Sequence, residues 1–165
     1  MSKNRGIQPG TTVWDEESAK LDVAIRRVRN HYSNTYPTLK CFKKFSKKMK
    51  IEYMGDDCFA FQPDGGAWFK DKKLVVAFEG KKQNDAGNAN QRWWDNASTA
   101  HHLNKDIIYV TFCSGKACGQ DKAFHKMMRK AHILYGKNFI FFLSENGFTE
   151  EDIEQKMKEI LESVA

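Results

Sequence analysis

The sequence predicts a single α/β domain in which helices flank a mixed β-sheet. Short apolar runs alternate along the chain with stretches whose apolar residues recur at helical spacing. Two of these runs, residues 107–112 and 138–143, are continuously apolar, which is typical of strands buried on both faces of a sheet. The chain has 165 residues, enough for one domain with a hydrophobic core. We expect a flexible N-terminal arm at residues 1–14 and one domain over residues 15–165.

The N-terminal half predicts two helices followed by strands. Apolar residues recur at helical spacing in residues 15–33, and Pro37 disfavours helix at the residue before it. Residues 40–50 show the same spacing among six lysines, which predicts a second helix with a positively charged face. From residue 58 the period becomes that of strands, which we expect at residues 58–62, 67–70 and 73–79.

The C-terminal half predicts an alternation of helices and strands. A helix over residues 121–135 connects the two continuously apolar runs as a crossover. The last helix begins after Thr149, a suitable N-cap residue that three acidic residues follow. Its apolar stripe consists of Ile153, Met157, Ile160, Leu161 and Val164. This order of elements predicts a mixed sheet with helices on its faces.

The composition is basic and lacks the features of a membrane protein. Lys and Arg total 27 against 21 Asp and Glu, and the net charge of +6 favours an anionic partner such as nucleic acid. Solubility alone is the alternative explanation of this charge. No apolar run approaches the roughly 20 residues that span a bilayer, and the N-terminus lacks the apolar stretch of a signal peptide. We therefore expect a cytoplasmic protein without a membrane partner.

The four cysteines follow no recognised spacing. A cytoplasmic location argues against disulfides. Two of the cysteines can be drawn as a zinc site with two histidines, as Cys113, Cys118, His125 and His132. Their spacing fits none of the usual zinc patterns, so we do not expect this site to form.

Two carboxylates and a lysine lie at the ends of the expected hairpin. Asp64 follows Pro63 at a break between strands, Glu79 closes the strand of residues 73–79, and Lys81 comes two positions later. Residues two apart on a strand point to the same face, so Glu79 and Lys81 converge. With the carbonyl of Gly80, the two carboxylates form an all-oxygen site suited to Mg²⁺. A neighbouring lysine can orient an attacking water and offset phosphate charge, although acids and lysines at strand ends are also ordinary surface residues.

The spacing of these residues resembles that of the PD-(D/E)xK nuclease superfamily. Pro-Asp, fourteen intervening residues and Glu-x-Lys make up the pattern. The segments "PDGG", "VVAFEGKK" and "AGNANQR" are similar, in the same order, to catalytic and recognition segments of the EcoRI-type restriction endonucleases. The similarity is closest over residues 60–95, and a fainter one extends over residues 17–112.

The resemblance implies a restriction-endonuclease-like core and a catalytic site. Asp64 and Glu79 match the metal-binding carboxylates and Lys81 the catalytic lysine, with Mg²⁺ as the cofactor and Mn²⁺ as its substitute. An acid of the first helix often joins the metal in this superfamily, and the candidates are Glu16, Glu17 and Asp22. A solvated helix face is the alternative for each of these three.

The resemblance also implies contacts with double-stranded DNA. Asn88, Ala89 and Arg92 match residues that reach base edges in the major groove, where Asn pairs with adenine and Arg reads guanine or braces a phosphate. Gln91 stands where the family has Glu, which puts the family's recognition sequence in question. The alternative is a polar loop and a helix start. Only six residues separate Lys81 from Asn88, so the chain resembles a minimal core without DNA-embracing arms.

The lysine-rich segment offers further DNA contacts. Its candidate phosphate ligands are Lys43, Lys44, Lys47 and Lys48. A solvated helix face is the alternative reading. Trp68, Trp93 and Trp94 are expected in the core or an interface rather than stacked on bases.

The sequence thus predicts a Mg²⁺-dependent DNA endonuclease, sequence-specific in the manner of a type II restriction enzyme. We expect a homodimer, because one catalytic site cuts one strand and a two-fold dimer cuts both strands of a palindrome. The alternatives are a homing or nicking endonuclease, a structure-specific nuclease of the resolvase type, and a DNA-binding protein that keeps the scaffold without cleaving.

Overall fold

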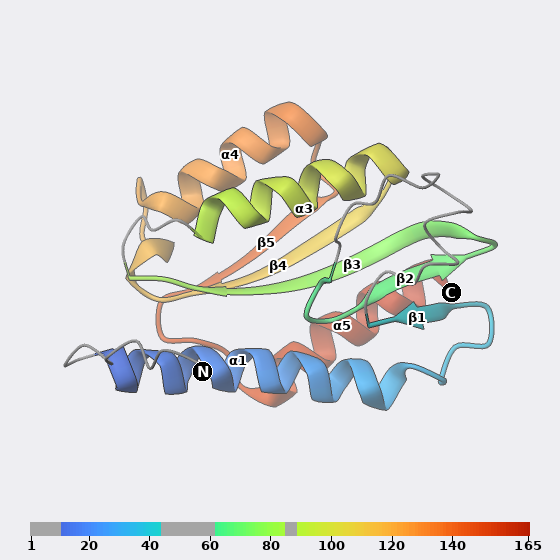
Figure 1. Cartoon of the computed structure of the whole chain (residues 1–165), viewed down its shortest axis with the longest axis horizontal. Helices are drawn as coiled ribbons and strands as arrows, with labels where there is room; N and C mark the ends of the chain where they lie inside the picture. Colours follow the sequence, from blue (N-terminus) through green and yellow to red (C-terminus); the bar gives the residue numbers. More distant parts are fainter. Residues whose placement is uncertain (1–10, 44–61, 85–88) are drawn as a thin grey trace, which may run out of the picture.

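A computed structural model describes residues 11–43, 62–84 and 89–165, apart from the side chains of residues 11–19, 89 and 90 (Figure 1). The described residues form a five-stranded sheet in the order β1-β2-β3-β4-β5. Helices cover both faces of this sheet: α1 and α5 lie on one face and α3 and α4 on the other (Figure 1). The expected α/β class, with a mixed sheet flanked by helices, is confirmed.

The sheet combines an antiparallel meander with two parallel strands. Strands β1 (Lys40–Phe42), β2 (Ala67–Lys70) and β3 (Lys73–Lys82) pair antiparallel. Strands β4 (Ile108–Ser114) and β5 (Phe139–Ser144) continue the sheet parallel to β3. Strand β3 is therefore the point at which the sheet changes direction, and it has a paired neighbour on each side.

Four α-helices and one short 3₁₀ helix complete the described fold. Helix α1 spans Thr11–Tyr32, and α3 (Ala89–Leu103) connects β3 to β4. The crossover from β4 to β5 contains the 3₁₀ helix η1 (Lys116–Cys118) and α4 (Ala123–Tyr135). Helix α5 (Glu150–Val164) begins with the expected cap at Thr149, whose side chain accepts a hydrogen bond from the backbone of Asp152 while Asp152 accepts one in return.

Two expectations for the N-terminal half need correction. Helix α1 begins at Thr11, so residues 11–14 belong to it rather than to an N-terminal arm; residues 1–10 lie outside the described part of the chain. The helix expected over residues 40–50 is wrong at its start, because Lys40–Phe42 form the edge strand β1. Phe42 packs there edge-on against Phe69 of the neighbouring strand, with ring centroids 5.5 Å apart. The rest of that helix and residues 58–61 of the first expected strand lie outside the described residues.

The core lies on both faces of the sheet. Trp68 belongs to the face that packs on α1 and α5, and Trp93 to the face that packs on α3 and α4; both are fully buried, as expected. Trp94 is partly buried next to Trp93. From Val76 onward the apolar residues of β3 alternate between these two faces: Val76 and Phe78 face α1 and α5, whereas Ala77 faces α3 and α4.

Candidate active site

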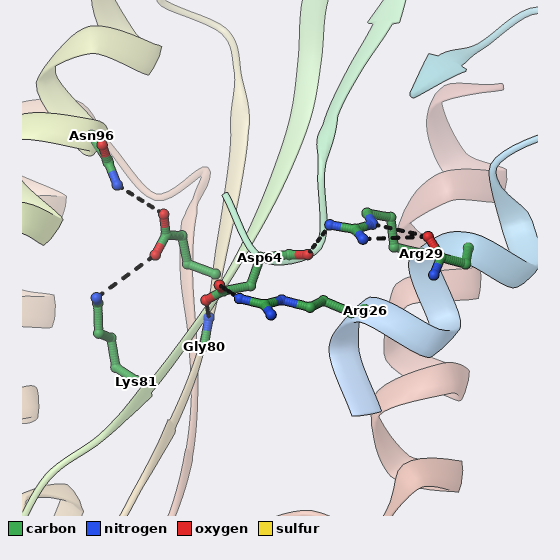
Figure 2. Close-up of polar contacts among 8 residues, drawn as sticks. Arg26, Arg29, Asp64, Gly80, Lys81 and Asn96 are labelled. Atoms are coloured by element: carbon green, nitrogen blue, oxygen red, sulfur yellow. Dashed lines mark hydrogen bonds and ion pairs between the residues drawn. The ribbon is translucent and has the colours of Figure 1, made fainter. Parts of the chain in front are cut away.

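Strand β3 directs its last side chains to two different helices. The Glu79 carboxylate accepts a hydrogen bond from Asn96 of α3, and Lys81 lies on the same face of the strand. Gly80 points to the opposite face, where Ile25 and Asp22 of α1 lie against it. Figure 2 shows Asn96 and Lys81 on one side of the strand and the arginines of α1 on the other. The end of β3 thus collects polar groups from both helical layers.

A tight turn brings Asp64 to this strand. The backbone of Gly65 donates a hydrogen bond to the carbonyl of Phe78 over 2.9 Å, and a Cβ on Gly65 would stand only 2.4 Å from the Phe78 Cβ. Gly66 has a φ of +84°, a conformation that favours glycine. The Asp64 Oδ2 atom accepts a hydrogen bond from the Gly80 backbone over 3.2 Å. The two glycines after Asp64 therefore allow its carboxylate to reach β3 between Glu79 and Lys81.

Two arginines of α1 hold Asp64. The Arg29 Nη1 atom donates to the Asp64 backbone carbonyl over 2.9 Å, and burial lowers the pKa of the Arg29 guanidinium. The Arg26 Nη2 atom lies 3.6 Å from Asp64 Oδ1 and stays 54% exposed. One arginine thus fixes the main chain, and the other compensates the charge of the carboxylate.

The Glu79 carboxylate lies in a buried environment. Its side chain is 3% exposed, with Oε1 3.0 Å from the Asn96 amide nitrogen and Oε2 3.9 Å from the Lys81 ammonium. Burial raises the pKa of Glu79 to about 7; the charge of Asp64 adds to this increase, and Lys81 opposes it.

A buried tyrosine adjoins this carboxylate. Burial raises the pKa of Tyr109 well above its usual range, and the neighbouring Glu79 carboxylate raises it further. Within the described part of the chain, no group forms a hydrogen bond of good geometry with the Tyr109 hydroxyl.

Asp22 is the first-helix acid that the structure places at the site. A Cβ on Gly80 would stand 3.2 Å from Asp22 Oδ1. Burial, and after it the charge of Asp64, raises the pKa of Asp22 to about 6, while Arg26 and Lys81 oppose the increase. The side chains of Glu16 and Glu17, the other two candidates, lie outside the described residues. Three carboxylates therefore interact electrostatically around the end of β3.

The expected DNA-binding residues are described only in part. Helix α3 begins at Ala89, and the side chains of Gln91 and Arg92 are exposed in its first turn. Asn88 lies outside the described residues, as do Lys44, Lys47 and Lys48. Lys43 is exposed just after β1, two strands away from β3 in the sheet. Of the expected DNA contacts, Gln91 and Arg92 are thus the described side chains on the helix that also carries Asn96.

Sequence reasoning did not assign a role in the site to Asn96, Tyr109, Arg26 or Arg29. The one available signal is that Asn96 follows Arg92 by four residues, which places both on one side of a helix. Nothing in the sequence shows which helix covers which face of β3, so their roles depend on the tertiary structure.

Comparisons with known proteins give no match. No protein-family model, curated protein or solved structure matches this chain.

Within the described residues, no group of three or more His, Cys, Asp or Glu side chains converges to hold a metal ion, and Cys113 and Cys118 are buried with free thiols. Among the helices of the described part, none has the length and apolar character needed to cross a membrane.

Proposed function

We propose that this chain is a Mg²⁺-dependent DNA endonuclease built on a restriction-endonuclease-like core. The observation that carries the proposal is the convergence of Asp64, Glu79 and Lys81 at the end of β3. These are the three positions that match the PD-(D/E)xK pattern in the sequence. The mixed sheet, with helices on both faces, agrees with the core that the resemblance implies.

The donor chemistry of the site fits a hard divalent cation. Asp64 and Glu79 supply carboxylate oxygens and Gly80 a backbone carbonyl, and Mg²⁺ is commonly held by one or two carboxylates together with water and substrate phosphate. The raised pKa values of Glu79 and Asp22 indicate negative charge that the described protein groups compensate incompletely. When bound, Mg²⁺ or Mn²⁺ would supply Lewis-acid stabilisation of the charge that develops on the phosphate.

The other groups of the site have roles in hydrolysis. Lys81 is largely buried beside Glu79, with its ammonium positioned to orient the attacking water and to offset phosphate charge. Asp64 keeps its place through Arg29 and the Gly80 backbone, so its carboxylate orientation depends on α1 and β3 together. Attack by water forms a new bond to the phosphorus while the bond to the 3′ oxygen breaks. The water loses a proton to solvent and the departing 3′ oxygen takes one up, which leaves a 5′ phosphate and a 3′ hydroxyl.

Helix α3 is the proposed DNA-reading element. Its first turn exposes Gln91 and Arg92, whose amide and guanidinium groups can pair with base edges in the major groove. The net charge of the chain, +6, also favours binding to DNA phosphates. We propose that two chains form a homodimer on a palindromic site, one half-site per subunit.

The direct test is cleavage of plasmid DNA. Supercoiled plasmid incubated with the protein and Mg²⁺ should become linear, and sequencing of the ends should reveal one palindromic site. The reaction should stop with EDTA and resume with Mn²⁺. Ends without two-fold symmetry, or nicked circles alone, would favour a homing or nicking enzyme, and cleavage of branched DNA alone would favour a resolvase. Tight binding without cleavage under all these conditions would indicate a non-cleaving DNA-binding protein.

A further inference from the structure

We propose that Asn96 is a positioning residue: it orients the Glu79 carboxylate for metal binding and links it to the DNA-facing end of α3. This inference rests on the proposed function and assigns a role to a residue outside the sequence motif. Asn96 belongs to the helix, whereas the three motif residues belong to the hairpin.

The contact itself is short and sheltered. The Asn96 Nδ2 atom donates to Glu79 Oε1 over 3.0 Å, and the Glu79 side chain is buried. A buried carboxylate that receives a hydrogen bond on one oxygen loses rotational freedom. The Lys81 ammonium, 3.9 Å from the other oxygen, is too far away for a hydrogen bond. Asn96 is therefore the stronger constraint on the orientation of this group.

Helix α3 is itself anchored beside Glu79. Trp93 is fully buried, and its indole donates to the Thr111 hydroxyl over 2.9 Å. Thr111 is the residue of β4 that pairs with Glu79 of β3. Ala97 is fully buried as well, so one face of the helix packs closely on the sheet around the carboxylate. The position of α3 therefore determines where the Asn96 amide stands relative to Glu79.

The same helix presents the expected base-reading residues. Asn96 follows Arg92 by four residues, so the two side chains lie on one side of α3 about 6 Å apart along its axis. Gln91 and Arg92 are exposed. Trp93 and Ala97 pack α3 against the sheet, so a DNA sequence that fits these side chains poorly would displace the helix only by moving it relative to β3. Such a displacement would change the Asn96–Glu79 hydrogen bond. Discrimination between DNA sequences would then affect the cleavage rate, through the metal site, as well as the DNA affinity.

The metal-binding test compares three variants with the wild-type protein. Asn96→Ala removes the donor, and Asn96→Leu removes it while keeping a similar size. Ser98→Ala is the control, because it removes one hydrogen bond from the same helix, between Ser98 and Tyr135 and away from β3. Calorimetric titration with Mg²⁺ and Mn²⁺ without DNA should show about 10- to 100-fold weaker binding for both Asn96 variants. Ser98→Ala should bind both cations with wild-type affinity. Thermal unfolding checks that each variant is folded.

The link to recognition is tested on DNA. The substrates are the site found by end-sequencing and the same site with one base pair changed. DNA affinity of Asn96→Ala without metal should stay within about twofold of wild type, since the DNA-facing end of α3 is intact. The ratio of the single-turnover rate on the found site to that on the altered site should fall at least about tenfold. Without the Asn96 hydrogen bond, the orientation of the Glu79 carboxylate no longer depends on the position of α3.

The outcomes separate the two proposals. Wild-type metal affinity in both Asn96 variants would overturn the positioning role while leaving the endonuclease assignment intact. Weaker metal binding with an unchanged rate ratio would overturn the link to recognition alone. A wild-type protein that binds neither cation and cuts no DNA would overturn the proposed function and this inference together.

Discussion

The two carboxylates of the site are held in opposite ways. Asp64 is 19% exposed, faces the Arg26 guanidinium and accepts a hydrogen bond from the backbone of Gly80. Glu79 is 3% exposed and receives its one described hydrogen bond from a neutral amide, that of Asn96. A cationic helix therefore supports the first carboxylate, whereas a mostly apolar face surrounds the second.

This difference indicates which of the two carboxylates destabilises the folded protein when it is ionised. Asp64 pairs with the exposed Arg26 guanidinium and receives a hydrogen bond from the Gly80 backbone. The ionised form of Glu79 is destabilised by burial, and Lys81 compensates it only in part. A bound cation would remove that penalty, so we expect metal binding and stability to be coupled through Glu79 more strongly than through Asp64.

The largest expected effect is on DNA cleavage, and it should be the same for the two carboxylates, Asp64 and Glu79. Asp64→Ala and Glu79→Ala should each leave no detectable cleavage, because the proposed metal site would lose one of its two carboxylates. Lys81→Ala should lower the single-turnover rate by about 10²- to 10³-fold while the protein still binds Mg²⁺. Plasmid cleavage and calorimetry measure the two effects, and Lys158→Ala, at an exposed position of α5, is the control. Wild-type nicking by any of the three variants would contradict the assignment.

The next effect separates the two carboxylates by pH. The pKa of Glu79 is raised in the folded protein from an ordinary 4.5 to about 7, so the folded state retains a proton that the unfolded chain releases. The free energy of unfolding should therefore fall as the pH rises from about 4.5 to 7, by about 3 kcal/mol from this group. Glu79→Gln should remove this decrease and be the more stable protein at pH 8. Urea unfolding between pH 5 and 8 measures it.

Asp64→Asn is the matched variant for this comparison. It keeps an acceptor for the Gly80 backbone but loses the ion pair with Arg26. We expect most of the pH dependence to remain, because burial is the principal cause of the Glu79 shift. Equal pH profiles for Glu79→Gln and the wild-type protein would show that Glu79 is not destabilised by burial.

A smaller effect divides the two arginines of α1. Arg29→Ala removes the hydrogen bond to the Asp64 carbonyl and the packing of the buried stem against Gly66, and should cost about 2 kcal/mol of stability. Arg29→Lys should recover only part of this loss, since lysine cannot reproduce the planar guanidinium. Chemical unfolding at constant pH measures both variants. A neutral Arg29→Ala substitution would show that the turn holds Asp64 without help from α1.

Arg26→Ala should have the smallest effect. Its guanidinium is 54% exposed and 3.6 Å from Asp64, so the ion pair contributes at most about 1 kcal/mol to stability. The same substitution should raise the Mg²⁺ affinity up to about fivefold, because in the proposed site the guanidinium would compete with the cation for Asp64. Calorimetry without DNA measures this gain, with exposed Arg129→Ala as the control. A loss of affinity would mean that Arg26 supports the metal site instead.

Much of the fold follows from local sequence patterns. The continuously apolar runs predicted β4 and β5, and the acidic turn after Thr149 predicted the start of α5, because burial on both faces and helix capping leave local signatures. The edge strand β1 could not be predicted in this way, because three residues are too few to show a period. The lysine-rich segment that follows has apolar residues at helical spacing, which predicted a helix instead. Its pairing with β2 is a non-local contact.

The proximity of the three motif side chains was predictable, because it depends on strand spacing. Asp64, Glu79 and Lys81 could be selected because a hairpin and a period of two determine their approach. Asn96 and Tyr109 could not, since their proximity to Glu79 depends on α3 covering that face of β3 and on β4 pairing beside it. Asp22 fell between these cases: the helix position was predictable, but its approach to Gly80 needed the packing of α1 on the sheet.

Gly80 also acts as a spacer between two layers of the protein. A methyl group at this position would stand 2.8 Å from the end of the Ile25 side chain, closer than real contacts permit. The backbone there is ordinary, so the restriction is one of size alone: alanine at this position requires the end of the Ile25 side chain to shift or Ile25 to become smaller. The middle position of the Glu-Gly-Lys segment is therefore tied to a residue in a distant helix. Libraries that vary position 80 alone should be enriched in glycine, whereas libraries that also vary position 25 should contain more substitutions at position 80, paired with smaller residues at position 25.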